Sequence, residues 1–151
     1  MLTAVAHAHV PATPEQVFGV LADGRSYAYW VLGARRIRSV DPGWPAPGTR
    51  IHHALGFLGI EPVRDSTVVR AVEPGSLLDL QARMWPFGEV RIVLRLEPED
   101  GGTRVTMEER PVKGPADRVH NPLLALALKL RNTWALRRLA RLARARAAAS
   151  A

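Results

Sequence analysis

The chain has 151 residues, 47% of them apolar and 23% charged, a composition typical of one globular domain with a full core. It contains no cysteine, which excludes disulfides, thiolate metal sites and a cysteine nucleophile. The net charge of +7 is uneven, because residues 1–117 sum to −1 while residues 118–151 hold eight basic and no acidic side chains, so an electrostatic function would belong to the C-terminal segment.

The N-terminal residues lack the basic and apolar regions of a signal peptide. No apolar segment approaches the roughly 20 residues that a membrane-spanning helix needs. We therefore expect a cytoplasmic protein. We also expect a single domain over residues 1–151, with a basic helix end and tail from about residue 137, since no repeat or linker interrupts the chain.

The N-terminal part predicts a strand followed by two short helices. Alternating small apolar residues indicate a strand over residues 2–10. Thr13, Pro14 and Gln16 are typical of a helix start, with Thr as the cap and Pro at the first helical position. Residues 26–30 predict the second short helix.

From residue 34 onward the pattern changes to segments of period two separated by turns rich in Pro, Gly and Asp. Such short connections join consecutive strands into an antiparallel meander. Apolar Val90, Ile92 and Leu94 alternate with Arg91 and Arg95, which predicts a sheet with one covered and one wet face. The expected strands span residues 35–40, 49–55, 65–73, 77–84, 89–97 and 103–110.

The longest predicted element is a C-terminal helix that begins with Asn121 as cap and Pro122 and runs to about Arg146. Its first half is apolar nearly all round, so we expect it to be largely buried, whereas the second half is amphipathic with a basic back. A helical wheel gives an inward stripe of Leu124, Leu128, Arg131, Ala135, Leu139 and Leu142, with Asn132 at its border.

Residues 10–18, 21–30 and 101–106, with the terminal helix that follows, resemble the polyketide cyclase/dehydrase and lipid-transport family of the START-like (SRPBCC) superfamily. The resemblance implies the helix-grip fold. This is an α+β architecture in which a curved antiparallel sheet of about seven strands surrounds a long C-terminal helix, with two short helices after the first strand. It also implies a cavity for a lipid, polyketide or isoprenoid, but no activity, because the superfamily has no shared catalytic motif.

Polar side chains on apolar faces are the candidates for chemistry in such a cavity. Arg131 could orient a ligand carbonyl or carboxylate, Asn132 could hydrogen-bond it, and Glu109 or one histidine could move a proton. Of the adjacent residues His52 and His53, one must face inward. The favoured alternative is a buried Arg131–Glu109 ion pair without ligand contact, because a buried charge must be paired.

Aromatic side chains are candidates for the cavity wall. Phe57 begins an apolar segment bounded by glycines, which predicts a lid over the cavity mouth, with ordinary loop packing as the alternative. Trp30 and Trp85 are the next candidates. The predicted ligand contacts are Trp30, Phe57, Trp85, Met107, Glu109, Leu128, Arg131, Asn132 and Ala135.

No metal and no cofactor is expected. His7 and His9 share a strand face and could approach a metal together with His52 or His53, but no further ligand stands at a confirming spacing. The sequence also lacks a phosphate loop, a nucleophile elbow and an H-E-x-x-H motif.

Arg137, Arg141 and Arg144 form the basic back of the terminal helix. A solvated face is the favoured interpretation, with an anionic membrane surface as the alternative. Nucleic acid is disfavoured, since no aromatic residues or groove-reading motif accompany the arginines. The sequence makes no prediction of oligomeric state.

The leading hypothesis is a protein that binds or carries a small hydrophobic ligand. The alternative is a polyketide-type cyclase, aromatase or dehydratase that uses Glu109, Arg131 and either His52 or His53. A third hypothesis is an interaction module whose basic helix docks on a membrane or a partner, with the cavity filled by the protein's own side chains. Convergence of the histidine, glutamate and arginine would favour the enzyme, and an apolar lining would favour the carrier.

Overall fold

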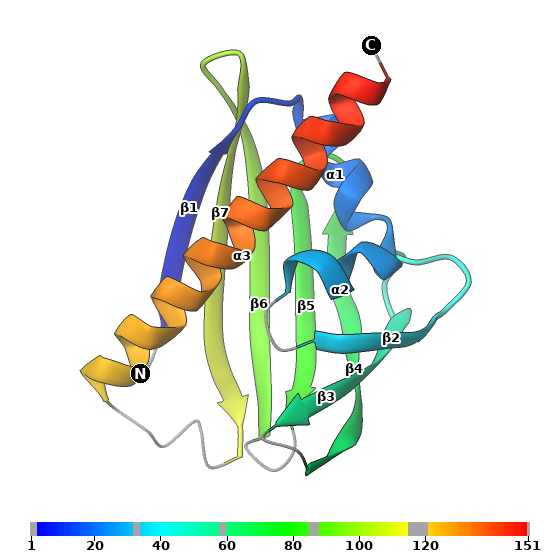
Figure 1. Cartoon of the computed structure of the whole chain (residues 1–151), viewed down its shortest axis with the longest axis vertical. Coiled ribbons are helices and arrows are strands. Elements are labelled where there is room, and N and C mark those ends of the chain that lie inside the picture. The colour runs from blue at the N-terminus through cyan, green and yellow to red at the C-terminus, as the bar shows by residue number, and fades with distance from the viewer. Residues whose placement is uncertain (1–2, 32–33, 58–59, 85–87, 115–120, 151) are drawn as a thin grey trace.

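The computed structural model describes residues 3–31, 34–57, 60–84, 88–114 and 121–150, without the side chains of 34–36, 54–57, 60–64 and 84. The element order agrees with the prediction (Figure 1). The helical elements are α1 (Pro14–Leu21), the 3-10 turn η1 (Gly24–Ser26), α2 (Tyr27–Trp30) and α3 (Pro122–Ala149). The strands are β1 (Ala4–Val10), β2 (Ala34–Val40), β3 (Arg50–Phe57), β4 (Ile60–Glu73), β5 (Leu77–Met84), β6 (Gly88–Glu99) and β7 (Gly102–Lys113).

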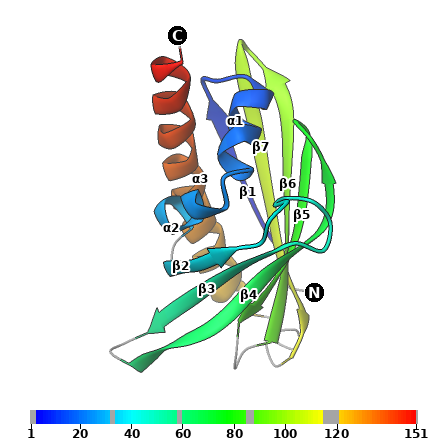
Figure 2. The ribbon, with the colours of Figure 1, turned by 90° about the vertical axis from the view of Figure 1, so that its right-hand side faces the viewer.

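The seven strands form one antiparallel sheet in the order β1-β7-β6-β5-β4-β3-β2. The first strand therefore pairs with the last, while the intervening strands follow as a meander. Figure 2 shows that the sheet bends, so that β3 and β4 sweep away from the upright strands toward the side on which α3 lies. A curved sheet that holds a long C-terminal helix on its concave side is the helix-grip fold, as predicted.

The ends of the helices are set by local sequence. At the start of α1, Thr13 Oγ1 accepts a hydrogen bond from Gln16 N at 3.1 Å and Gln16 Oε1 accepts one from Thr13 N at 2.9 Å. This reciprocal capping box satisfies two backbone donors that the helix leaves free. At the start of α3, Asn121 Oδ1 accepts a hydrogen bond from Leu123 N at 2.9 Å, which confirms the predicted cap.

One face of the sheet is apolar and turns toward α3. The alternation on β6 is as predicted, with Val90, Leu94 and Leu96 buried while Arg95 on the opposite face is exposed. The same face continues over the neighbouring strands by register. Its other buried apolar members include Ala4, Ala6, Val69, Leu78, Leu80, Ala82, Val105 and Met107.

The predicted burial of the first half of α3 is wrong. Leu123 is 75% exposed, Leu126 52%, Leu130 56% and Trp134 54%, and in Figure 1 the first turns of α3 reach beyond the edge strand β1. No described element covers them there. The buried residues of α3 lie in its later turns and are Asn132, Ala135, Leu136, Leu139 and Ala143.

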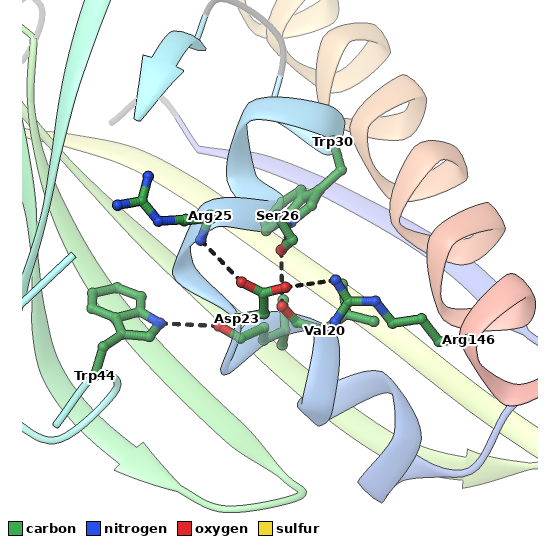
Figure 3. Close-up of polar contacts among 8 residues, drawn as sticks. Val20, Asp23, Arg25, Ser26, Trp30, Trp44 and Arg146 are labelled. Carbon is green, nitrogen blue, oxygen red and sulfur yellow. Dashed lines mark hydrogen bonds and ion pairs between the residues drawn. The ribbon is translucent and has the colours of Figure 1, made fainter. Parts of the chain in front are cut away.

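The later turns of α3 are also tied to the α1–α2 connection (Figure 3). Arg146 donates to Asp23 Oδ2 at 2.6 Å, and the other oxygen of Asp23 accepts a hydrogen bond from Arg25 N at 3.2 Å. Behind this pair, Ser26 Oγ donates to Val20 O at 2.9 Å. The basic end of α3 is thus partly engaged with the body of the protein through Arg146.

Candidate functional site

A buried carboxylate lies between the sheet and α3. Glu109, on the inward face of β7, is 2% exposed, and its Oε2 accepts a hydrogen bond from Asn132 Nδ2 at 2.8 Å. Its Oε1 lies 3.4 Å from a guanidinium nitrogen of Arg131. A carboxylate so deeply buried requires such donors, because desolvation without them is costly. This group of three side chains is named the Glu109 cluster below.

The helical wheel predicted Arg131 on the inward stripe of α3 and Asn132 at its border, and the structure shows the reverse. Asn132 is 1% exposed and lies on the buried face of α3, whereas the side chain of Arg131 is 32% exposed and lies at its border. The favoured structural interpretation, an Arg131–Glu109 ion pair, is therefore present with Asn132 as an additional donor. About a third of the Arg131 side chain remains accessible to solvent.

The remaining predicted contacts near the Glu109 cluster are apolar. Met107 lies two residues before Glu109 on the same face of β7 and is 5% exposed, while Ala135 lies one helical turn after Arg131 and is 3% exposed. Leu128 lies one turn before Asn132 and is half-buried. The structure thus brings together Met107, Glu109, Leu128, Arg131, Asn132 and Ala135, six of the nine predicted ligand contacts.

Ile92 is an unexpected feature of this region. It lies on the inward face of β6, in register with Glu109 on one side and Leu80 on the other. Its neighbours on that face, Val90 and Leu94, are buried, but Ile92 itself is only partly buried. Solvent therefore reaches an apolar side chain near the middle of the sheet, on the face that α3 crosses.

A second group of buried polar side chains lies on β3 and β4. His53, the inward member of the histidine pair, is 8% exposed, and its Nε2 lies 3.0 Å from Thr67 Oγ1. Its register partner Asp65 is 7% exposed and lies 3.6 Å from Arg83 Nε. Burial lowers the pKa of His53, and the nearby Asp65 carboxylate opposes that effect only in part.

The structure separates the predicted acid–base residues. His52 faces away from the interior and donates from Nε2 to Asp41 Oδ1 at 2.9 Å, a hydrogen bond that lowers the pKa of Asp41. His53 faces inward, but β4, β5 and β6 lie between its strand and that of Glu109, about 19 Å along the sheet at the usual strand spacing. Among the described side chains, Glu109 and the two histidines do not form one constellation.

The lowered pKa of His53 predicts a loss of stability in mild acid. Below about pH 6.5, the ordinary histidine value, the unfolded chain binds a proton that the folded chain takes up only at lower pH. The stability associated with neutral His53 is thus complete above pH 6.5 and is lost as the pH falls through the pKa of His53 in the folded protein. The charges that act on this ring are Asp65, Arg38 and His52.

Urea unfolding at pH 7.5 and pH 5.5 tests this expectation. We expect the difference in unfolding free energy between the two pH values to shrink in the His53→Leu variant. The exposed His7 serves as a control, since its replacement by leucine should leave the difference unchanged. If the difference in unfolding free energy between pH 7.5 and pH 5.5 were as large in His53→Leu as in the wild type, His53 would not be a source of the acid sensitivity.

The aromatic candidates fall in different places. Trp30 is 1% exposed, packs on Tyr27 at a ring-centroid distance of 4.7 Å and donates from Nε1 to Ser26 Oγ at 3.3 Å. The backbone of Phe57 pairs with that of Ile60, and these two ends of the predicted lid segment lie on β3 and β4. The Phe57 side chain, residues 58–59 and Trp85 lie outside the described residues.

The two N-terminal histidines lie on the outer face of β1. His7 Nδ1 is 3.4 Å from Thr106 Oγ1, and His9 Nδ1 is 3.1 Å from Glu99 Oε2. Both side chains are exposed and belong to a different face of the sheet from His53. Among the described residues, no group of three or more histidine, cysteine or acidic side chains is placed to hold a metal ion.

Sequence reasoning did not single out Thr67 and Asp65. Thr67 and Asp65 lie two and four residues before the apolar Val69. Because alternate residues of a strand share a face, this spacing indicates that they face inward with Val69. The signal was too weak because both faces of this strand carry polar residues. Only the pairing of β4 with β3 shows that Thr67 and Asp65 lie beside the inward histidine.

Residues 1–144 match the family described as polyketide cyclase / dehydrase and lipid transport. No curated protein matches the chain. None of the described helices is long and apolar enough to cross a bilayer.

Solved structures share the fold at low identity. A Rhodobacter sphaeroides protein is 25% identical with a TM-score of 0.70, over 92% of this chain and 89% of its own. A Staphylococcus aureus protein of unknown function is 10% identical with a TM-score of 0.73, over 95% and 93%. Ara h 8.0201 is 17% identical with a TM-score of 0.70, over 95% and 97%.

Proposed function

Because the chain belongs to the polyketide cyclase/dehydrase and lipid transport family, we propose that it binds or carries a small hydrophobic ligand between the concave face of the sheet and α3. A lipid, polyketide or isoprenoid type of molecule suits this face, because its side chains are mostly apolar and its polar groups are few and localised. The Glu109 cluster would meet the ligand at one end through the partly exposed Arg131.

The partial exposure of Ile92 is the observation that carries this proposal. A large apolar side chain in the middle of a sheet is normally fully covered by the helix packed on that face. Ile92 is in register with the buried Glu109 and Leu80 and still contacts solvent. An apolar ligand that displaced this solvent would gain roughly 25 cal/mol for each Å² of apolar surface it covers.

Binding is favoured over cyclase chemistry by the placement of the acid–base groups. Glu109 already accepts hydrogen bonds from Asn132 and Arg131, and His53 lies four strands further along the sheet, with β4, β5 and β6 in between. General acid–base catalysis requires its groups within hydrogen-bond reach of one reacting centre. The Glu109 cluster is better suited to orienting a polar end of the ligand than to moving protons together with a histidine.

Filling the space beside Ile92 tests the proposal. We expect Ile92→Trp to weaken binding of the neutral fluorescent probe 1-aminoanthracene by about tenfold or more, since overpacking costs about 1–3 kcal/mol. Val93→Trp is the matched control, because its side chain lies on the opposite face of β6. Equal affinities of the two variants would contradict the proposed location. Native mass spectrometry of protein purified from its own host would identify a ligand that copurifies.

We further propose that α3 brings the carrier to an anionic membrane surface. Its outward stripe runs along one side of the helix and is apolar in the first half and basic in the second. Each member is exposed, and no acidic residue occurs from 118 to 151. The members of the outward stripe are Leu123, Leu126, Leu130, Trp134, Arg137, Arg141 and Arg144.

This arrangement is the one that an interfacial helix requires. Its apolar side chains enter the boundary of the acyl chains, and its arginines attract anionic headgroups. Trp134 lies between the two halves, and tryptophan favours the membrane–water interface. A ligand released from the concave face would then be close to the bilayer.

Vesicle co-sedimentation measures this interaction. We expect replacement of Arg137, Arg141 and Arg144 by glutamine to weaken binding to phosphatidylglycerol-containing vesicles by about 100-fold, at about 1 kcal/mol for each arginine. Binding should also fall with rising salt.

A charge-matched control separates this stripe from a general effect of net charge. Replacing the exposed Arg38, Arg70 and Arg95 of the sheet removes the same charge elsewhere and should have a much smaller effect. Vesicle binding that is equally reduced by both triple variants, or that is insensitive to salt, would contradict membrane docking through α3.

A further inference from the structure

The His53 group combines deep burial with an unmet hydrogen-bonding atom. His53, Asp65 and Thr67 are 8%, 7% and 8% exposed, and all three lie on the inward face where β3 pairs with β4. Around them the same face carries Ile37 and Ile51, both buried. Three polar side chains in an apolar surrounding are costly unless their atoms find partners.

One atom of this group has no partner. His53 Nε2 lies 3.0 Å from Thr67 Oγ1, but no described polar atom lies within hydrogen-bond distance of the buried Nδ1. Leaving such an atom unsatisfied costs free energy in the folded protein, whereas an apolar residue of similar size would cost none. A binding partner that supplies the missing hydrogen bond would therefore gain affinity from it.

The chemistry of the imidazole selects the partner. Burial lowers the pKa of His53, so near neutral pH the ring has one donor and one acceptor nitrogen. Thr67 can accept from Nε2 or donate to it, which makes Nδ1 an acceptor or a donor respectively. A hydroxyl group satisfies both arrangements, whereas a carbonyl satisfies only one. A ligand carboxylate would also have to approach the buried Asp65.

The group lies on the same concave face as the proposed ligand space. Thr67 is in register with Ala82 on β5, which is in register with Val90 on β6, two residues before Ile92. The strands of His53 and Ile92 are three spacings apart in the sheet, or about 14 Å at the usual strand separation. An elongated ligand that covers Ile92 could reach His53 with one end.

We infer that His53, held by Thr67, is an anchor for a neutral hydroxyl group, phenolic or alcoholic, of an otherwise apolar ligand. The inference rests on the proposed ligand-binding function and specifies the ligand class. It assigns the hydroxyl-bearing end of the ligand to β3 and β4, opposite the Glu109 cluster on β7 and α3.

Two probes of the same size test the anchor. Naphthalene and 2-naphthol differ by one hydroxyl group, and their dissociation constants are measured by fluorescence titration at pH 7.5. The ratio of the two dissociation constants is first corrected for the difference in octanol partition between the probes. After this correction, we expect the wild-type protein to bind 2-naphthol about tenfold more tightly than naphthalene. In His53→Leu this preference should disappear while naphthalene binding is retained.

The neighbouring residue supplies the control. His52→Leu makes the same replacement one position earlier, on the outer face, and should keep the preference for 2-naphthol. Thr67→Val leaves the imidazole in place without its hydroxyl partner and should reduce the preference without abolishing naphthalene binding. If His53→Leu does not fold, Thr67→Val still tests the anchor, because replacing threonine by the similarly shaped valine is a smaller change.

The outcomes separate this inference from the proposed function. Equal preference in wild type and both His53-group variants would overturn the anchor, with a trapped water as the partner of Nδ1, and would leave the binding function intact. If the folded wild-type protein bound none of the three probes naphthalene, 2-naphthol and 1-aminoanthracene, both the anchor and the proposed binding function would be overturned. A stronger preference for 2-naphthoate than for 2-naphthol would overturn the neutral-hydroxyl assignment.

Discussion

Replacing Leu139 by alanine is expected to lower the free energy of unfolding by about 3 kcal/mol, within the range of about 2–5 kcal/mol for a buried leucine. Leu139 is 0% exposed and lies where α3 packs on the body of the protein. Its replacement removes apolar contact and leaves a cavity that rigid neighbours fill only in part. For a chain of this size, the melting temperature should fall by about 6–12 °C.

Leu130 is the matched control for Leu139. It lies on the same helix but is 56% exposed, so Leu130→Ala should change the free energy of unfolding by less than about 0.5 kcal/mol. Urea unfolding followed by circular dichroism measures both variants. Similar losses in the two would mean that the first half of α3 is packed, as the helical pattern alone predicts, and would contradict the observed placement of the helix.

Replacing Asn132 by alanine is the second large effect that we expect, at about 3 kcal/mol. Asn132 Nδ2 donates to the buried Glu109 at 2.8 Å, and the variant leaves that carboxylate with a weaker set of donors in a dry environment. Loss of a partner from a buried charged group costs about 3–5 kcal/mol, against about 1 kcal/mol for an ordinary hydrogen bond. Thermal and urea unfolding at pH 7.5 measure the loss.

A double-mutant cycle shows whether the loss arises from the Glu109 carboxylate. In a Glu109→Leu background the charge is absent, so Asn132→Ala should cost markedly less than in the wild type. Thr133→Ala provides a control on the same helix, because the Thr133 hydroxyl donates to the helix carbonyl of Lys129 at 2.8 Å and not to Glu109. An additive cycle would contradict a stabilising contact between Asn132 and Glu109.

The elements themselves could be predicted because their signals are local. The capping box of Thr13 and Gln16, the cap at Asn121 and the apolar alternation on β6 act over a few residues. The structure agrees with each of them. Strand ends were less accurate, since β4 begins at Ile60 and not at Asp65, because pairing with β3 extends a strand beyond its own pattern.

The candidate site was predictable only in part. The Arg131–Glu109 pair followed from the rule that a buried charge needs a partner, and its contact at 3.4 Å agrees with that rule. The role of Asn132 as the central donor did not follow, because a shift of one residue on a helical wheel turns a side chain by about 100°. The Thr67 contact of His53 depends on strand register, which hydrophobic alternation does not specify.

The sequence by itself determined the order of elements, the inward face of the sheet and the concentration of basic residues in the last helix. The tertiary structure alone decided where α3 crosses the sheet, and therefore that its apolar first half is exposed while Asn132, Leu136 and Leu139 are buried. The physical reason is that helix periodicity reports which residues share a side. It does not report whether a neighbouring element covers that side, which depends on the curvature and edge of a sheet built from residues far away in the chain.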